Sequence, residues 1–320
     1  MTVGDSPFPL LRLPSLLFRH VARYMENIDR LALSYVSNRT KSLVISIDLK
    51  CTEVMIQIEE AIIVRIDFPS YDNLICTFED CPENGESKVH RLRDTREGFT
   101  FHKPEYRLED SLSHIFEIYH QPNIVTVSIG RLLPDMEEFR RCIKSFSGLY
   151  ISRDLTDIET WNILKTFKPE KRLFLDHIPF GNDKGMFHEF LIQNLEAIEL
   201  RWNNIPLDCL LITNSEFIKI ITPKINEKVL NRFIKHWING SNPRLKHLEL
   251  WCPKSLSEIN LSVVLKGIRH QEIPETYRRS FKGLECTIHV DGGYDIRRKD
   301  GTVATVWSYD QENFDFFVWI

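Results

Sequence analysis

The chain has 320 residues, of which 42% are hydrophobic and 27% are charged, a composition typical of folded globular proteins. Its formal net charge of -4 argues against a nucleic-acid-binding role, because such proteins usually carry an excess of basic residues. No run of about 18 apolar residues occurs, so no membrane-spanning helix is expected.

The N-terminal stretch from Phe8 to Met25 is a poor match to a signal peptide, because Arg12 and Arg19 interrupt its apolar region. The seven cysteines are odd in number and scattered along the chain. Without a secretory signal, these thiols are expected to be reduced. The sequence therefore predicts a cytoplasmic or nuclear protein that is not secreted.

Residues 1–48 are expected to form three short helices. Pro14 suits the first turn of a helix, and Leu17, Val21 and Tyr24 follow at helical spacing. Asn27 and Ser37 are candidate caps for the second and third helices. The apolar residues point in more than one direction, and a unit this small cannot bury them all. Some must face the rest of the chain or a partner.

The next region is rich in β-forming residues. We expect strands at "LVISIDL" (43–49), "AIIVRIDF" (61–68) and "NLICTF" (73–78). The polar stretch 78–98 is expected to be a surface loop or a hairpin connection.

A loose repeat follows, in which six strand-like segments alternate with helical ones. Their centres lie roughly 20–30 residues apart, near the pitch of leucine-rich repeats. The segments are "NIVTVSI", "GLYISR", "KRLFLDHI", "LEAIELRW", "EFIKII" and "RLKHLELW". This pattern predicts an irregular, leucine-rich-repeat-like β-α solenoid with parallel strands. We divide this part into a strand-rich and β-α region, 49–195, and a C-terminal domain, 196–320.

The C-terminal segment is expected to be an antiparallel meander. Asp291-Gly292 and Asp300-Gly301 are hairpin signals between short strands. Such a meander would cover the last open edge of the parallel strands. The predicted fold class is mixed: α+β with α/β character, comprising three N-terminal helices, a β-α solenoid and a meander.

No catalytic or cofactor motif stands out. Cys286 and His289 would point to opposite faces of a strand, and Cys76 and Cys81 lack the second pair of a zinc signature. Arg297 and its basic neighbours are followed by an acidic residue, which favours a solvated hairpin edge. We therefore expect no enzyme activity, metal or cofactor, although a cysteine-dependent enzyme remains the alternative for a cysteine-reactive probe to detect.

The first 48 residues resemble an F-box. The match rests on "FPLLRLP", "IDRLALSYVSNRTK" and in particular the Leu13-Pro14 pair. The resemblance implies docking to a small Skp-type adaptor and, through it, to a cullin-RING ubiquitin ligase. The implied adaptor contacts are Leu13, Pro14, Leu17, Val21, Leu31 and Leu33. The alternative is an N-terminal helical cap that packs wholly onto the solenoid.

The C-terminal part resembles the type-2 F-box-associated domain of the large nematode F-box family. The matching features lie in "VLNRFIKHWINGSNPRLKHLEL" and "YDIRRKDGTVATV". The pair of resemblances implies a substrate receptor of a ubiquitin ligase, which binds a target protein and performs no chemistry. The alternative is a repeat-type interaction scaffold that is not part of a ligase.

Strand alternation suggests where a target could bind. If Leu248 and Leu250 point inward, then His247, Glu249 and Trp251 point outward, and Arg201 is outward by the same rule. Trp and Arg are enriched at interface hot spots, so Arg201 and Trp251 are the candidate target-binding residues. The alternative is that Trp251 folds beneath the meander. The apolar stripe through Trp237 is expected to pack on the sheet beneath residues 244–251.

Overall fold

The computed structural model forms two compact units, residues 1–147 and 148–320, which are described separately. The structure describes residues 12–70, 73–79, 86–91, 98–102, 108–120, 124–131, 136–143, 145–179, 184–203, 205–223, 226–252, 259–308 and 313–319. Residues 8–11 of the expected N-terminal motif and Cys81 lie outside these ranges.

The first unit begins with three helices, as expected. They are α1 (Ser15–Arg23), α2 (Asn27–Val36) and α3 (Asn38–Ile45). Ser37 caps α3 through a capping box with Thr40, which confirms the cap expected there. The strand expected at 43–49 was wrong, because α3 continues through Ile45 and the chain then turns. The buried Val44 shows that this helix uses the β-forming residues as its core face.

The first unit also contains a six-stranded sheet in the order β6-β1-β2-β3-β4-β5. The strands are β1 (Glu53–Ile58), β2 (Ala61–Asp67), β3 (Leu74–Glu79), β4 (Glu86–Arg91), β5 (Gly98–His102) and β6 (Ile124–Ile129). β1 is parallel to β6, and β1 to β5 form antiparallel pairs. The strands expected at 61–68 and 73–78 are thus confirmed. The polar stretch 78–98 contains β4 and connects successive hairpin strands.

Two helices complete the first unit, α4 (Leu108–Ile118) and α5 (Met136–Cys142). Helix α4 packs beside α3 and α5. Leu112, Ile115 and Ile118 on α4 are fully buried, and their spacing of three gives the helix a core-facing side.

In the second unit five parallel strands lie side by side in chain order. They are β7 (Gly148–Ile151), β8 (Arg172–Leu175), β9 (Ala197–Arg201), β10 (Phe217–Ile221) and β11 (His247–Trp251). All six strand segments expected from the repeat, β6 included, are therefore strands. The inward side chains are mainly Leu and Ile, such as Leu173, Ile198 and Leu248, each at most 2% exposed.

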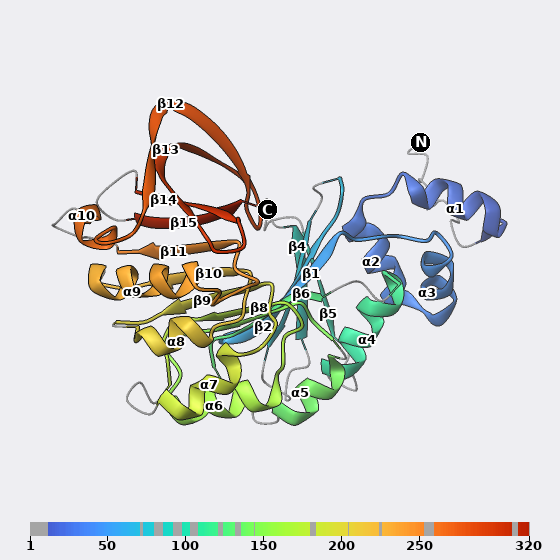
Figure 1. Ribbon diagram of the computed structural model, residues 1–320. Helices are drawn as coiled ribbons and strands as arrows, with labels where there is room; N and C mark the ends of the chain where they lie inside the picture. The colour runs from blue at the N-terminus through green and yellow to red at the C-terminus, as the bar shows by residue number, and fades with distance from the viewer. Residues whose placement is uncertain are drawn as a thin grey trace. The chain divides into compact units, whose positions relative to one another are not determined.

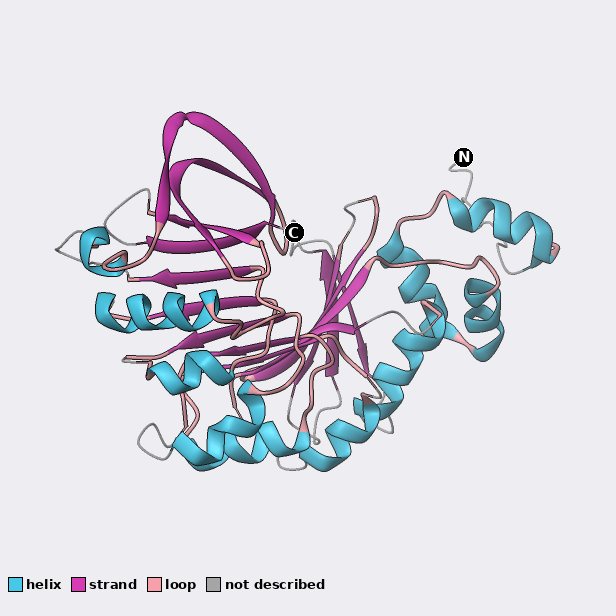
Figure 2. Cartoon of the chain, in the orientation of Figure 1, coloured by secondary structure: helices cyan, strands magenta, loops and turns pink. Residues whose placement is uncertain are grey.

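Helices connect these strands and lie along one face of them (Figure 2). They are α6 (Asp157–Thr166), α7 (Lys184–Leu191), α8 (Leu207–Ile212) and α9 (Glu227–Ile238), and α10 (Leu261–Val264) follows β11. The other face of the parallel strands is therefore lined by strand side chains. Among the residues that the structure describes, no helix is long and apolar enough to cross a lipid bilayer.

The second unit closes with an antiparallel meander, as expected. Its strands are β12 (His270–Lys282), β13 (Thr287–Arg297), β14 (Val303–Trp307) and β15 (Asn313–Trp319). β15 pairs with β11 and so covers the edge of the parallel strands, which leaves β12 as the outer strand at that end. Figure 1 shows β12 and β13 as long, strongly curved strands.

The turn expected at Asp291-Gly292 was wrong, whereas Asp300-Gly301 does join β13 to β14. Gly292 lies inside β13, opposite a bulge in which residues 274–277 of β12 face this single residue. Gly292 and Gly293 have φ angles of 70° and 104°, which favour glycine. A Cβ at Gly293 would lie 2.7 Å from Thr305 Cγ2. The glycine pair therefore bends the strand and does not end it.

Candidate functional site

Helix α1 carries apolar side chains on two faces. Phe18 and Ala22, four residues apart, are fully buried. On the other face three side chains are 51%, 40% and 80% exposed: Leu17, Val21 and Tyr24. Their spacing of four and three residues makes them one stripe along the helix. Exposed apolar side chains do not stabilise an isolated unit, so this stripe is a candidate docking surface.

Arg30 on α2 fixes the position of α1. Its guanidinium donates to the carbonyl oxygens of Ala22 at 2.8 Å and Arg23 at 2.7 Å, at the C-terminal end of α1. It also donates to Asn27 Oδ1 at 2.9 Å. Asn27 was expected to cap α2, but it is the first residue of the helix. Glu26 occupies the N-cap position without a side-chain capping hydrogen bond.

The second helix is held against α4 by a buried contact. The ring of His114 on α4 stacks on Tyr35 with the ring centroids 4.1 Å apart. His114 Nε2 also lies 2.8 Å from the hydroxyl oxygen of Ser34. The three N-terminal helices are therefore anchored to the rest of their unit through α2 and α3. The exposed stripe of α1 remains uncovered by the described residues of that unit.

The residues implied as adaptor contacts fall into three groups. Pro14, Leu17 and Val21 are exposed. Leu13 and Leu33 are partly buried against the cluster around Phe18. Leu31 is fully buried, so its side chain supports the unit from within.

The implied adaptor contacts do not include three of the most exposed apolar residues in this region: Leu16 at 75%, Tyr24 at 80% and Val36 at 66%. Tyr24 continues the 17–21–24 spacing, a signal that was visible in the sequence. Leu16 and Val36 have no such signal, because only the packed structure shows which side of each helix is covered.

The second candidate surface is the strand-lined face of the parallel strands. The strand register aligns Arg201 with Ile221 and Ile221 with Trp251. Arg201 and Trp251 therefore share a row and are separated by one strand, or about 10 Å. Arg201 is exposed and Trp251 is partly exposed, so Trp251 is not enclosed beneath the meander. His247, expected to be outward as well, is only 7% exposed because Phe281 and Phe317 pack on its ring.

Polar side chains surround this row. The Tyr150 hydroxyl donates to Asp176, whose carboxylate also lies 3.6 Å from Arg201 Nε. Burial, followed by the hydrogen bond to Asp176, raises the pKa of Tyr150 to about 12. This phenol therefore keeps its proton at neutral pH and acts as a hydrogen-bond donor.

Lys219 is the central cation of the same face. Its ammonium lies 3.4 Å from Glu249 and 5.6 Å from the centre of the Trp251 ring. Burial raises the pKa of the neighbouring Glu199 against the opposing effect of Lys219. Alternation along β7 and β10 could have identified Tyr150 and Lys219, because both flank inward residues. Nothing in the sequence indicates that Asp176, just after β8, joins them.

Comparisons with known proteins match two regions of the chain. The family model described as "F-box domain" matches residues 10–52, and the model described as "F-box associated" matches residues 186–250. The F-box associated domain-containing protein sdz-33 of Caenorhabditis elegans is 22% identical over 303 residues, covering 94% of this chain and 93% of that protein.

The chain therefore carries an F-box domain and an F-box-associated domain, and it is similar to nematode proteins of that kind. An uncharacterized protein of the same nematode is 23% identical over 340 residues, covering 98% of this chain and 94% of the relative. No solved structure matches the chain.

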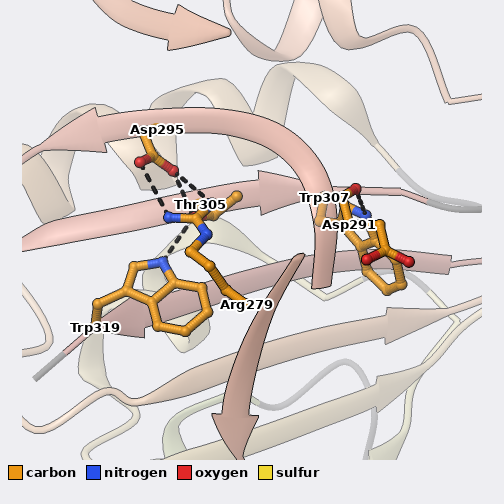
Figure 3. A network of polar contacts seen from close by, with 6 residues as sticks. All are labelled: Arg279, Asp291, Asp295, Thr305, Trp307 and Trp319. Carbon is orange, nitrogen blue, oxygen red and sulfur yellow. Dashed lines mark hydrogen bonds and ion pairs between the residues drawn. The ribbon is translucent and has the colours of Figure 1, made fainter. Parts of the chain in front are cut away.

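A polar network holds the C-terminal strands of the second unit together (Figure 3). Arg279 on β12 donates to both carboxylate oxygens of Asp295 on β13, at 3.1 Å and 2.9 Å. The Thr305 hydroxyl on β14 accepts from Arg279 and from Trp319 Nε1, and donates to Asp295 at 2.6 Å. The network thus joins four strands through one hydroxyl whose hydrogen-bonding capacity is filled.

Two of the cysteines weighed as ligands or nucleophiles lie in the described part of the chain, at Cys76 and Cys286. Cys286 is exposed in the turn before β13, and His289 pairs with Ser280 across the hairpin. Burial raises the pKa of Cys76 to about 12, which suppresses its thiolate form. No group of three potential metal ligands occurs among the described residues. F-box and F-box-associated families are typically non-catalytic adaptors.

Proposed function

We propose that this protein is the substrate-receptor subunit of a Skp-cullin-F-box-type ubiquitin ligase. In this role the F-box docks a Skp-type adaptor and the C-terminal unit binds a target protein, in the cytoplasm or the nucleus. The protein performs no chemistry and needs no cofactor. It raises the local concentration of the target near the conjugating enzyme, which is catalysis by proximity.

The exposed apolar stripe of α1 is the observation that carries the proposal. Leu17 and Val21 stay uncovered although Phe18 and Ala22 on the same helix are fully buried. The family match assigns this helix to an F-box, whose general partner is a Skp-type adaptor. Interface anchors of this kind commonly contribute about 2 kcal/mol or more each to binding.

We propose the strand-lined face of the second unit as the target surface. Arg201 and Trp251 lie in one row there, beside Tyr150 and Lys219. We also propose that β7 to β11 and their helices are an irregular leucine-rich-repeat-like stack, since successive parallel strands and one-sided helices support that description. The predicted domain divisions were 1–48, 49–195 and 196–320. The proposal keeps the first of them, whereas the strand pairing across residue 195 favours a boundary at residue 148 instead.

Co-purification with a Skp-type adaptor tests the docking role. The variant Leu17→Asp with Val21→Asp should lose adaptor binding by more than about tenfold, because it places two charges in an apolar interface. It should keep its fold, since both side chains are exposed. Ile158→Asp, at a residue 66% exposed on α6, is the matched control and should bind the adaptor normally.

Unchanged adaptor binding by the double variant would refute the docking assignment. Leu13→Ala with Pro14→Ala is a weaker test, because Leu13 also packs against the core around Phe18. Arg201→Ala with Trp251→Ala should lose target capture and retain the adaptor. Target capture by a protein that never binds the adaptor would instead support a scaffold outside any ligase.

A further inference from the structure

A groove of about 540 Å³ lies in the second unit, between the meander and the starts of the parallel strands. It is lined by aromatic side chains from three strands, namely Phe217 on β10, Phe281 on β12 and Trp319 on β15, together with Leu284 in the β12–β13 turn. Its volume falls in the range of pockets that hold small ligands or a few peptide side chains. It is separate from the row of Arg201 and Trp251.

The walls of this groove are held in place before any ligand arrives. The Arg279 guanidinium lies 4.5 Å from the Trp319 ring centre, and Trp319 Nε1 donates to Thr305 at 2.7 Å. The Phe281 ring meets the Trp319 ring edge-to-face at 5.7 Å. The network of Figure 3 therefore fixes Trp319 relative to β12 and gives the groove a preformed aromatic end.

The turn that carries Leu284 is equally tight. Gly283 N–H donates to the Cys286 carbonyl at 2.9 Å, and a Cβ at Gly283 would lie 2.7 Å from that oxygen. A larger residue would push the turn open. Gly283 thus keeps Leu284 at the rim.

The charges at the rim favour an anionic partner. Glu216 is neutralised twice, by Lys246 at 2.7 Å and Arg244 at 3.2 Å, and the hydrogen bond from Lys246 lowers its pKa. Arg172 pairs with Glu196 at 3.5 Å and with Glu285, beside Leu284, at 3.3 Å. With Glu285 included, the three carboxylates at the rim face four cations, the fourth being Lys282. Lys282, which also lines the groove, has no ion pair among the residues the structure describes.

We propose that this groove binds an extended acidic peptide segment of the target, with a large apolar side chain inserted between Phe217, Phe281 and Trp319 and a flanking carboxylate on Lys282. This inference rests on the proposed function and names the chemistry of the recognised segment. The aromatic walls supply apolar contact area, and the unpaired ammonium supplies the charge preference.

The test uses the full chain and three fluorescein-labelled peptides. The first is Gly-Asp-Asp-Phe-Asp-Asp-Gly, the second replaces the four Asp by Lys, and the third replaces Phe by Ala. Fluorescence anisotropy should rank the first peptide tightest. The Phe-to-Ala peptide should bind at least tenfold more weakly, because it loses the apolar anchor.

Reversing the charge separates this site from non-specific attraction. Lys282→Glu should lower the affinity for the acidic peptide about fivefold and raise the affinity for the lysine peptide, as expected for an exposed ion pair. Lys299→Glu makes the same charge change at an exposed lysine in the β13–β14 turn and should leave both affinities unchanged. Equal effects of the two variants would show only a general charge effect and overturn the proposal.

Leu284→Asp adds a second check at a partly exposed turn position and should abolish binding of the acidic peptide. Failure of all three peptides to bind the folded chain would also overturn the proposal. Adaptor co-purification with the same preparations separates the two conclusions. Retained adaptor binding without peptide binding refutes only the proposed peptide-binding role of the groove. Lost adaptor binding refutes the proposed docking role of the F-box.

Discussion

Trp237 is the largest fully buried side chain of α9, and it links that helix to the meander. Its indole meets the Phe316 ring of β15 edge-to-face at 5.0 Å. The Arg298 guanidinium lies 5.5 Å from the centre of the same indole ring. The stripe predicted on this helix is confirmed, since Leu230, Phe233 and Ile234 are also at most 1% exposed.

We expect Trp237→Ala to lower the free energy of unfolding by about 3–5 kcal/mol, because it leaves a large cavity beneath β11 and β15. Urea denaturation of the full chain measures the effect. Tyr277→Ala, which removes an aromatic side chain that is 57% exposed, should change stability little. Equal losses in the two variants would contradict the burial argument.

Single-residue predictions succeeded where strand alternation alone decided the outcome. Leu248 and Leu250 are inward, and Glu249 is outward, as the period of two requires. His247 is outward too, but it is buried by Phe281, 34 residues later in the chain, and pairs with Asp315 at 2.8 Å. No local sequence pattern indicates that His247 is covered, because the covering residue Phe281 lies on the β12–β13 hairpin, which folds back over β11.

Two helices start with capping boxes that differ in one chemical respect. At α3 the box pairs Ser37 with Thr40, whereas at α6 it pairs Thr156 with Glu159. Glu159 accepts from both the backbone N–H and the hydroxyl of Thr156 at 2.8 Å. The backbone hydrogen bond, followed by that of the hydroxyl, lowers the pKa of Glu159 below its ordinary 4.5. Only the second box can therefore respond to pH.

We expect Glu159→Gln to reduce the free energy of unfolding by a few tenths of a kcal/mol at pH 7, since the pair is largely exposed and screened. The folded pKa lies below the unfolded one, so the contribution of the charge is present above pH 4.5 and disappears as the pH falls through the lowered value. Chemical denaturation across that range measures the difference.

Ser37→Ala is the matched control, because its box contains no titratable group. It should cost about 1 kcal/mol at every pH. A pH-independent effect of Glu159→Gln would mean that the charge contributes nothing to the cap.

At the level of elements, the sequence predicted every strand from β6 to β11, but it missed β1 and misread two segments. Residues 43–49 have the β-branched composition of a strand, yet the capping box of Ser37 starts a helix that runs into them. Asp291-Gly292 has the composition of a turn, but its glycines serve a bulge. In both cases the structure of adjacent residues outweighed the intrinsic conformational preference of the segment. The groove beneath the β12–β13 turn could not be predicted, because its lining residues come from distant segments.

The second unit has its own core and its own paired strands from residue 148 onward. Hydrogen-bonded pairs join Arg172 to Ala197 and Leu175 to Leu200 across the division predicted at 195. Cutting there would remove β7 and β8 and leave the edge of β9 and its apolar side chains uncovered.

We therefore expect a fragment of residues 148–320 to unfold cooperatively, and one of residues 196–320 to aggregate or to unfold without a clear transition. Circular dichroism and size-exclusion chromatography of both fragments measure this. A monomeric, cooperative fragment 196–320 would favour the boundary at 195.

The position of β15 has a consequence for biosynthesis. β15 is the last strand in chain order, but it lies between β11 and β14, so the meander is connected to the parallel strands through it. While the chain is still on the ribosome, β11 has an open edge and Phe233 and Trp237 lack the ring of Phe316. The second unit can close only after residue 319 has emerged. A nascent chain stalled before β15 would expose this apolar surface to chaperones, and a premature stop codon before this strand would remove the connection between the meander and β11.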